Sequence, residues 1–315
     1  MSPSIARGAL WRSGVVVLGG LCLASPAHAT FSIVACEPET GVCGVAVATH
    51  NLAVGNSVPF ARYGVGAGVS QFETNACHAP AMLQALKDNV DASGALDAAL
   101  EAEANCDDGL DKAYRQVALV TASGDFAAHT GNAAGGYAGH LGGEFVSVQG
   151  NGLASAAVLE AMLQTFETSD APLAERLLDA LEAGHKAGGQ SIGVLSAALR
   201  VATPQGWPVD IDLRVDFAHG TAVSELRRLY DASLARQLLF RAARTESENT
   251  AAALIARAAV LAPDWDRIQL RAARLASRLG RPRQATVYAC RFREINPEWA
   301  RRLANELDFG ACPAP

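Results

Sequence analysis

The chain has 315 residues, half of them hydrophobic, and a formal net charge of −6 at pH 7. This length allows one sizeable core and a smaller unit. The charge is uneven, because residues 30–233 carry 10 basic and 24 acidic side chains whereas residues 234–315 carry 14 and 8. The shift predicts two units, and the absence of a recognition motif in the basic one excludes a nucleic-acid-binding protein.

The first 29 residues have the order of a secretory signal peptide. Two arginines precede an apolar run at 14–23, and the small-x-small pattern Ala-His-Ala follows at 27–29. The run is too short to span a bilayer, and no later segment is long enough. We therefore predict cleavage after residue 29, a mature chain that begins at Thr30, and a periplasmic or secreted location without a membrane span.

Removal of the leader leaves six cysteines, an even number that suits disulfides in an exported protein. They are Cys36, Cys43, Cys77, Cys106, Cys290 and Cys312. Cys36 and Cys43 flank a Pro-Glu-Thr-Gly turn, and in a hairpin centred there they face each other, with Cβ atoms roughly 4.5–5.5 Å apart. Proximity along the chain then favours Cys77–Cys106 and Cys290–Cys312, with buried free thiols as the alternative.

The first unit alternates paired strands with paired helices. Strands are predicted at 30–35, 42–49, 64–70, 116–121, 126–130, 144–149, 196–202 and 210–215, and helices at 79–89, 92–104, 154–168, 171–187 and 221–233. This order differs from a strict βαβ alternation and predicts an α+β fold, with two packed antiparallel sheets between helix layers. Gly-x-Gly-x-x-Gly, Walker and Cys-x-x-Cys motifs are all absent, so the sequence predicts no cofactor and no metal site.

From about residue 234 the chain is helical and rich in alanine and arginine. The sequences Ala-Pro-Asp-Trp at 262–265 and Asn-Pro-Glu-Trp at 296–299 lie 34 residues apart. This is the period of tetratricopeptide repeats, so residues 234–315 resemble a small domain of one or two such helix pairs, with an ordinary helical tail as the alternative. Since an independent array normally needs three repeats, we expect the tail to pack on the first domain or on a protein partner.

Thr30 carries the chemical groups of a nucleophile and its base. A threonine hydroxyl is weak at neutral pH and needs an adjacent base. The α-amine that cleavage would free on the same residue has a pKa of about 8 and can accept the hydroxyl proton, directly or through water. A mature N-terminal threonine therefore unites nucleophile and base.

Residues 30–71, which begin TFSIVACEPETG, resemble the opening of a bacterial family called domain of unknown function 1028. Further matches follow in the family's order at 129–131, 138–140, 148–151, 196–199, 212–216 and 225–229. The resemblance implies a four-layer αββα sandwich of the N-terminal-nucleophile (Ntn) hydrolase type in residues 30–233, with Thr30 at the nucleophile position. It implies no substrate, because the family's own reaction is unknown.

The hairpin register and the resemblance suggest further site residues. Thr49 would lie opposite Thr30 and hold its amine or a bridging water, unless the two form an ordinary cross-strand pair. Asn151, in a predicted Gly-Asn-Gly turn, would aim an amide or backbone N–H at an oxyanion. The resemblance suggests Arg62 as a cation near the nucleophile, although it also suits a surface charge. Gln71 and Gln149 end strands and would line the pocket, unless they simply face solvent.

The chain departs from the family pattern at two places. An expected Asp-Arg-Gly-x-Gln-Ser run is reduced around residues 189–191, and an acidic-acidic-His stretch is reduced at 216–219. The leading hypothesis is an exported Ntn-type hydrolase that cleaves a small amide or peptide-like substrate. The alternative is a non-catalytic periplasmic binding or scaffold protein that docks a protein partner through its Arg-rich tail. The sequence leaves self-association into a homo-oligomer open.

Overall fold

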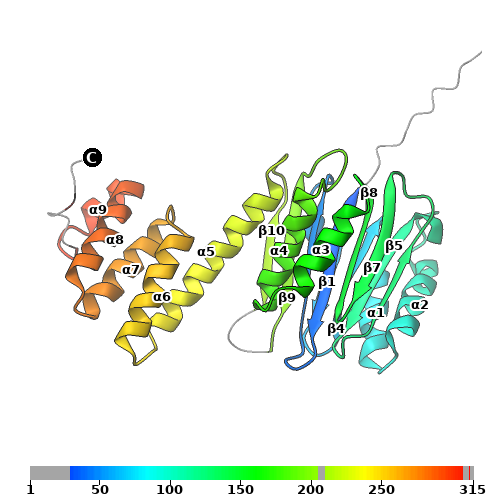
Figure 1. The fold of residues 1–315 in the computed structure, drawn as a ribbon, viewed down its shortest axis with the longest axis horizontal. Coiled ribbons are helices and arrows are strands. Elements are labelled where there is room, and N and C mark those ends of the chain that lie inside the picture. The colour runs from blue at the N-terminus through cyan, green and yellow to red at the C-terminus, as the bar shows by residue number, and fades with distance from the viewer. Residues whose placement is uncertain (1–28, 205–209, 308–311, 313–315) are drawn as a thin grey trace, which may run out of the picture.

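A computed structural model describes residues 29–204, 210–307 and 312. The predicted signal peptide lies outside these residues except for Ala29. The described chain contains two antiparallel sheets and a helical C-terminal region (Figure 1). No helix in these ranges combines the length and the apolar character that a bilayer span requires.

The larger sheet places the first hairpin at its centre. Its six strands run in the order β10-β9-β2-β1-β8-β7. Their bounds are β1 (Thr30–Glu37), β2 (Val42–Thr49), β7 (Tyr137–Gly143), β8 (Val146–Leu153), β9 (Ser196–Ala202) and β10 (Ile211–Val215). The smaller sheet has the order β3-β4-β5-β6, with β3 (Pro59–Arg62), β4 (Gly66–Phe72), β5 (Arg115–Thr121) and β6 (Phe126–Thr130).

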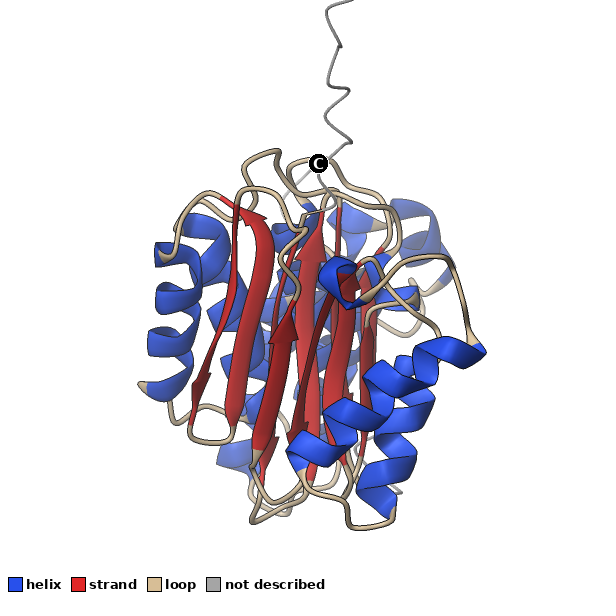
Figure 2. Cartoon of the chain, turned by 90° about the vertical axis from the view of Figure 1, so that its right-hand side faces the viewer, coloured by secondary structure: helices blue, strands red, loops and turns tan. Residues whose placement is uncertain are grey.

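Alternate residues of β1 face opposite layers, as the period of a strand requires. Phe31 and Ile33 pack in the core beneath two helices, α3 (Ala157–Glu167) and α4 (Leu173–Lys186). Val34 faces the other way and packs with Val69 and Val120 of the smaller sheet. Helices α1 (His78–Lys87) and α2 (Ala92–Glu101) cover the outer face of that sheet. Figure 2 shows the strands between helices on both sides.

Short 3₁₀ turns complete the first unit, at Val54–Asn56, Ala102–Asn105 and Lys112–Tyr114. Two strands were not predicted from the sequence. β3 has only four residues and begins with proline, which suits an edge strand. β7 is glycine-rich, and at Gly142 a larger residue would clash with β6, since a Cβ there would lie 1.8 Å from Cζ of Phe126.

The helical region is joined to the sheets by one continuous helix, α5 (Ala222–Ala242). Leu226 and Tyr230 pack in the core of the larger sheet, whereas Leu238 and Leu239 pack in the core of the tail. The expected boundary between residues 233 and 234 therefore falls inside α5, where its packing passes from one core to the other. The remaining helices are α6 (Glu248–Leu261), α7 (Asp266–Arg278), α8 (Pro282–Ile295) and α9 (Pro297–Arg302).

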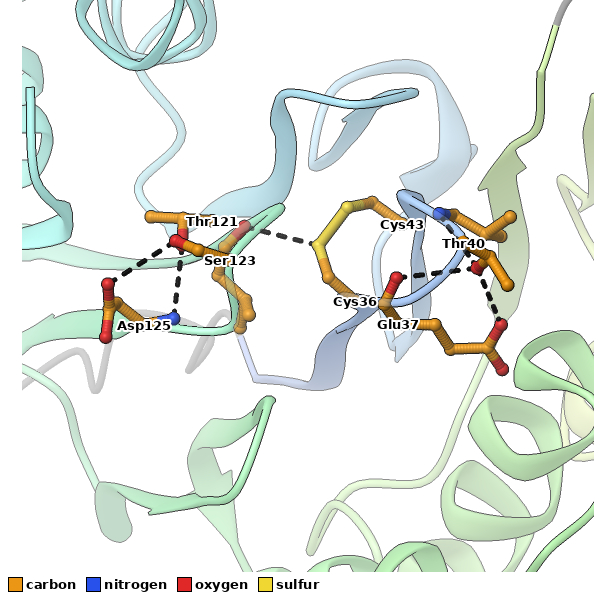
Figure 3. The surroundings of a disulfide bond; sticks show 9 residues. Cys36, Glu37, Thr40, Cys43, Thr121, Ser123 and Asp125 are labelled. Carbon is orange, nitrogen blue, oxygen red and sulfur yellow. Dashed lines mark hydrogen bonds between the residues drawn. A yellow bond between two sulfur atoms is a disulfide. The ribbon is translucent and has the colours of Figure 1, made fainter. Parts of the chain in front are cut away.

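Three disulfides join the cysteine pairs that proximity along the chain favours. They are Cys36–Cys43, Cys77–Cys106 and Cys290–Cys312. The first links directly opposed residues of β1 and β2, with Cα atoms 4.1 Å apart. Figure 3 shows that this bond lies where the end of the hairpin meets the smaller sheet, with Sγ of Cys36 3.5 Å from the carbonyl oxygen of Val120.

Candidate active site

Thr30 begins a central strand and is flanked on both sides by polar residues. It lies opposite Thr49 on β2 and opposite Asn151 on β8. Oγ1 of Thr30 is 3.0 Å from Oγ1 of Thr49, and its backbone N–H donates to Oδ1 of Asn151 at 3.1 Å. The register predicted for Thr30 and Thr49 is therefore present, and both chemically relevant groups of Thr30 are held by neighbours.

The hydroxyl protons of Thr30 and Thr49 can be assigned by counting hydrogen-bond donors and acceptors. The hydroxyl of Thr49 donates its single proton to the carbonyl oxygen of Ala29, at 2.7 Å, because that oxygen can only accept. The same hydroxyl accepts from the backbone N–H of Asn51 at 3.3 Å. The hydroxyl of Thr30 must then be the donor in its contact with Thr49.

Residue 29 closes this end of the sheet. Ala29 is 1% exposed and Thr30 is 3% exposed. The chain at Ala29 passes directly over Gly152, whose φ is +59° and where a Cβ atom would lie 2.5 Å from Cβ of Ala29. Only glycine suits both this backbone conformation and this close approach. Cleavage after Ala29 would free the nitrogen of Thr30 and remove the carbonyl oxygen to which Thr49 donates.

Asn151 lies beside Thr30 but in a different role from the one predicted. Strand β8 runs through residues 150–152, so the predicted turn is wrong. Oδ1 of Asn151 accepts from Thr30, and Nδ2 donates to Oε1 of Gln116 at 2.8 Å. Its amide therefore holds the nitrogen of Thr30 in this structure, a contact that the sequence did not predict.

Gln116 on β5 ties the two sheets together at this end, and the sequence did not identify it. Its Nε2 donates to Oγ1 of Thr130 at 3.0 Å and to the carbonyl oxygens of Gly139 at 3.1 Å and Gly150 at 2.9 Å. Its Oε1 accepts from Asn151 and, at 2.7 Å, from Gln71. A glutamine inside the apolar strand RQVALVT was the available signal for this role.

Gln71 and Gln149 lie beneath Thr30 and do not line an open pocket, which corrects their predicted role. Both are fully buried and converge on Ser32, two residues after Thr30. The hydroxyl of Ser32 donates to Oε1 of Gln71 at 2.7 Å and accepts from Nε2 of Gln149 at 2.6 Å. Together with Gln116 and Asn151 they form a network of neutral polar side chains between the sheets, which we call the Thr30 network.

Arg62 does not approach Thr30, so its predicted place is wrong. It ends β3 and pairs with Gly66, next to Gly64, whose N–H donates to the carbonyl oxygen of Gly41 in the first hairpin turn. This is the opposite end of β1, roughly 20 Å of strand away from Thr30. The cause is the course of the chain, because β3 runs away from the Thr30 end.

The Thr30 network reaches a pair of histidines at its edge. Oγ1 of Thr130, which accepts from Gln116, is 3.0 Å from Nδ1 of His140. Partial desolvation and the nearby His129 lower the pKa of His140 below its ordinary value. The neutral ring is therefore the dominant form of His140 at pH 7.

Two further polar side chains lie near this end, in or beside the segments that depart from the family pattern. Among the described residues, Nδ1 of His50 and both amide atoms of Gln190 are buried without a hydrogen-bond partner. The His50 ring lies 5.8 Å from the ring of His219, centroid to centroid. Gln190 is 4% exposed and bridges to Leu153, two residues past Asn151. These atoms make no hydrogen bond within the described ranges.

A second hydroxyl, that of Ser70, belongs to a separate buried cluster beneath α1. Oγ of Ser70 is 2.8 Å from Nδ1 of His78, and Nε2 of His78 is 2.9 Å from Oε1 of Glu103. Glu103 also accepts from Nε of Arg115 at 3.2 Å, and Arg115 pairs with Asp108 at 2.6 Å. Burial lowers the pKa of His78 despite the adjacent Glu103.

Comparison with known proteins assigns most of the first unit to one family. A model described as "Family of unknown function (DUF1028)" matches residues 30–226. The crystal structure of protein SPO2555 from Silicibacter pomeroyi, which carries the same family designation, is similar with a TM-score of 0.58 and 33% sequence identity. That similarity covers 64% of this chain and 84% of the other. No curated protein matches the chain.

Proposed function

This chain belongs to the family of unknown function DUF1028, and we propose that it is an exported hydrolase that cleaves an amide bond with Thr30 as its N-terminal nucleophile. One observation carries the proposal. The hydroxyl and the nitrogen of Thr30 are each held by a buried neighbour, and the residue bonded to that nitrogen is the last residue of the predicted signal peptide. The family match also begins at Thr30 and includes the whole Thr30 network.

The proposed chemistry uses the two groups of the freed threonine. The α-amine accepts the hydroxyl proton while Oγ1 attacks the substrate carbonyl carbon, and a tetrahedral intermediate forms. The intermediate collapses to an ester on Oγ1, and the departing amine takes the proton that the α-amine received. Water then attacks the ester, which releases the acid and restores the hydroxyl.

The neighbours of Thr30 have separate tasks in this mechanism. Oδ1 of Asn151 accepts one N–H of the amine, which leaves the nitrogen lone pair free to act as the base. Gln116 fixes Asn151 in turn. The hydroxyl of Thr49 already donates to a carbonyl oxygen, that of Ala29, and after cleavage it would be free to donate to a substrate oxygen or a bridging water.

The direct contacts of Thr30 favour a neutral substrate. The side chains that hydrogen-bond to it, those of Thr49 and Asn151, carry no charge. A small amide or peptide-like molecule offers the donors and acceptors that His50 and Gln190 leave free. The two sheets and their helix layers support assignment to the αββα sandwich of the Ntn type, and the three disulfides support a periplasmic or secreted location.

The second candidate is a binding or scaffold protein, with the tail as a tetratricopeptide-like docking unit. The observation that favours it is the pairing of α5 with α6 and of α7 with α8, with Trp265 and Trp299 at the 34-residue spacing. This reading requires no reactive group at Thr30.

A covalent probe distinguishes the two candidates. The processed protein would be treated with a β-lactone, an electrophile that acylates activated hydroxyls, and mapped by peptide mass spectrometry. We expect acylation of Oγ1 at Thr30 in the wild type and in Thr30→Ser, and none at this position in Thr30→Ala. Thr40→Ala, on the exposed hairpin turn, is the matched control and should be acylated at Thr30 like the wild type. A processed protein that begins at Thr30 and resists acylation would favour the scaffold.

A further inference from the structure

The tail contains a groove whose lining is dominated by arginine. The cavity measures about 590 Å³ and lies between α5, α7 and α9. Five arginines line it, with Trp265 and Trp299 and the apolar side chains of α7; the arginines are Arg236, Arg267, Arg271, Arg274 and Arg278. This volume lies within the roughly 300–1,000 Å³ typical of ligand sites.

Four of these arginines form a single stripe along α7. They follow one another at intervals of four, three and four residues from 267 to 278, which places them on one face of the helix. Like charges at this spacing repel each other and destabilise a helix. The adjacent face of α7 packs in the tail core through Ile268, Ala272 and Leu275, and Ile268 and Leu275 also border the groove. The arginine stripe is therefore a cost to folding that a ligand of opposite charge would offset.

Few acidic groups compensate this stripe. Arg274 pairs with Glu306 at 2.7 Å, and both side chains are largely exposed. Within the described ranges, no ion pair is found for Arg236, Arg267, Arg271 or Arg278. The two tryptophans are half-buried at the groove and offer flat apolar surfaces beside the guanidinium groups.

We infer that this groove binds an extended acidic peptide segment of a partner protein. The stripe extends about 16 Å along α7, at a rise of about 1.5 Å per residue. An extended peptide of about five residues covers this length, and its alternate side chains project on the same side at intervals of about 7 Å. Carboxylates at alternate positions would thus meet successive guanidinium groups, which bind carboxylates through paired hydrogen bonds. The intervening side chains would contact the tryptophans and the apolar wall.

The lining favours a peptide over a nucleic acid or a second copy of this chain. A phosphate backbone needs cations but does not use an apolar wall such as that formed by Ile268, Leu270 and Leu275. The acidic first unit of a second copy presents its carboxylates on folded helices and turns, which fit a narrow groove less well than an extended segment does.

Binding of a defined probe to the processed full chain tests the inference. The probe is a fluorescein-labelled peptide of alternating glutamate and alanine, and its neutral counterpart has glutamine in place of glutamate. We expect saturable binding of the acidic peptide by fluorescence anisotropy, with weakening at higher salt. The double variant Arg271→Gln, Arg278→Gln should bind roughly tenfold more weakly or worse, since two charge-assisted contacts are lost.

The matched control removes two exposed arginines outside the groove, with Arg257→Gln on α6 and Arg283→Gln on α8. It has the same net charge as the groove variant and should bind within about twofold of the wild type, because surface charges beyond the groove are screened. Equal binding by both double variants would overturn the inference. So would equally tight binding of an oligothymidylate of the same charge, or sedimentation showing self-association that only the groove variant loses.

Discussion

Two hydroxyls of this chain are placed for activation, and they differ in what covers them. Ser70 has the partners of a hydrolytic triad, a histidine at 2.8 Å followed by a glutamate. Thr30 contacts neither an imidazole nor a carboxylate, and its partners are Thr49 and Asn151. By residue type alone, Ser70 would be the stronger candidate.

Access by a substrate favours Thr30 over Ser70. Ser70 is 2% exposed, and its hydroxyl also accepts from the backbone N–H of Asn75 at 3.1 Å. The Cys77–Cys106 disulfide ties together the segments that hold His78 and Glu103. Thr30, by contrast, directly follows a residue that processing is expected to remove, which would place Thr30 at the chain end. The comparison teaches that a nucleophile is identified by what can reach it as well as by its partners.

Replacement of each hydroxyl in turn should give the largest difference in turnover between the Thr30 and Ser70 regions. On an amide substrate identified by screening, Thr30→Ala should lower turnover by roughly a thousandfold or more, because the acyl-enzyme route is lost. Thr30→Ser keeps hydroxyl and amine and should retain activity. Ser70→Ala should stay within about twofold of the wild type. Loss of turnover in Ser70→Ala but not in Thr30→Ala would exchange the roles of the two residues.

Asn151→Leu should have the next largest effect, since it removes the acceptor for the Thr30 nitrogen and the donor to Gln116. We expect turnover to fall by about a hundredfold, the order expected when a reacting group is displaced by about 1 Å. Gln84→Leu, which removes an amide that donates to Asp88 on the exposed side of α1, is the control and should leave turnover near the wild-type value. Equal rates for the two variants would show that Asn151 does not position the amine.

The Ser70 region should respond in stability rather than in rate. Replacement of Cys77 and Cys106 by alanine opens a link between residues 29 positions apart and should lower the free energy of unfolding by about 2–4 kcal/mol. Urea unfolding measures this loss, and the acylation of Thr30 measured beside it should persist. A double variant that is as stable as the wild type would remove the structural role given to this region.

The smallest effect should be a pH dependence of stability from His78. Burial lowers its pKa in the folded protein, so the unfolded chain binds the proton more readily. The stability linked to His78 is therefore complete above the unfolded pKa of about 6.5 and declines as pH falls through that value. Urea midpoints at pH 7.5 and 5.5 should differ more for the wild type than for His78→Gln. Equal differences would contradict this assignment.

The sequence predicted those site residues that depend on local pairing. The turn at residues 38–41 set the register that brings Thr30 opposite Thr49. Asn151 was placed near Thr30 by resemblance, but its role required knowledge of which strand lies beside β1. Of the strands that were missed, β3 is short and β7 is glycine-rich, and Gly142 and Gly143 of β7 lie against side chains distant in sequence.

The remaining site residues depend on how the sheets stack. Gln71 and Gln116 lie on the smaller sheet and Gln149 on the larger one, and nothing in their local sequence states that they share one buried layer. The prediction for Arg62 was wrong for a related reason, because the direction of β3 decides which end of the molecule Arg62 occupies. Non-local packing, rather than local propensity, therefore limited the prediction of the site.

The central claim is that Thr30 becomes the first residue and thereby gains both nucleophile and base. The most direct test is the N-terminal residue of the protein exported from cells that carry the full-length gene, measured by intact mass and N-terminal sequencing. We predict a chain that begins at Thr30 with a free α-amine. A chain that begins one or more residues to either side would leave the hydroxyl without its adjacent amine, or remove the threonine, and would contradict the account.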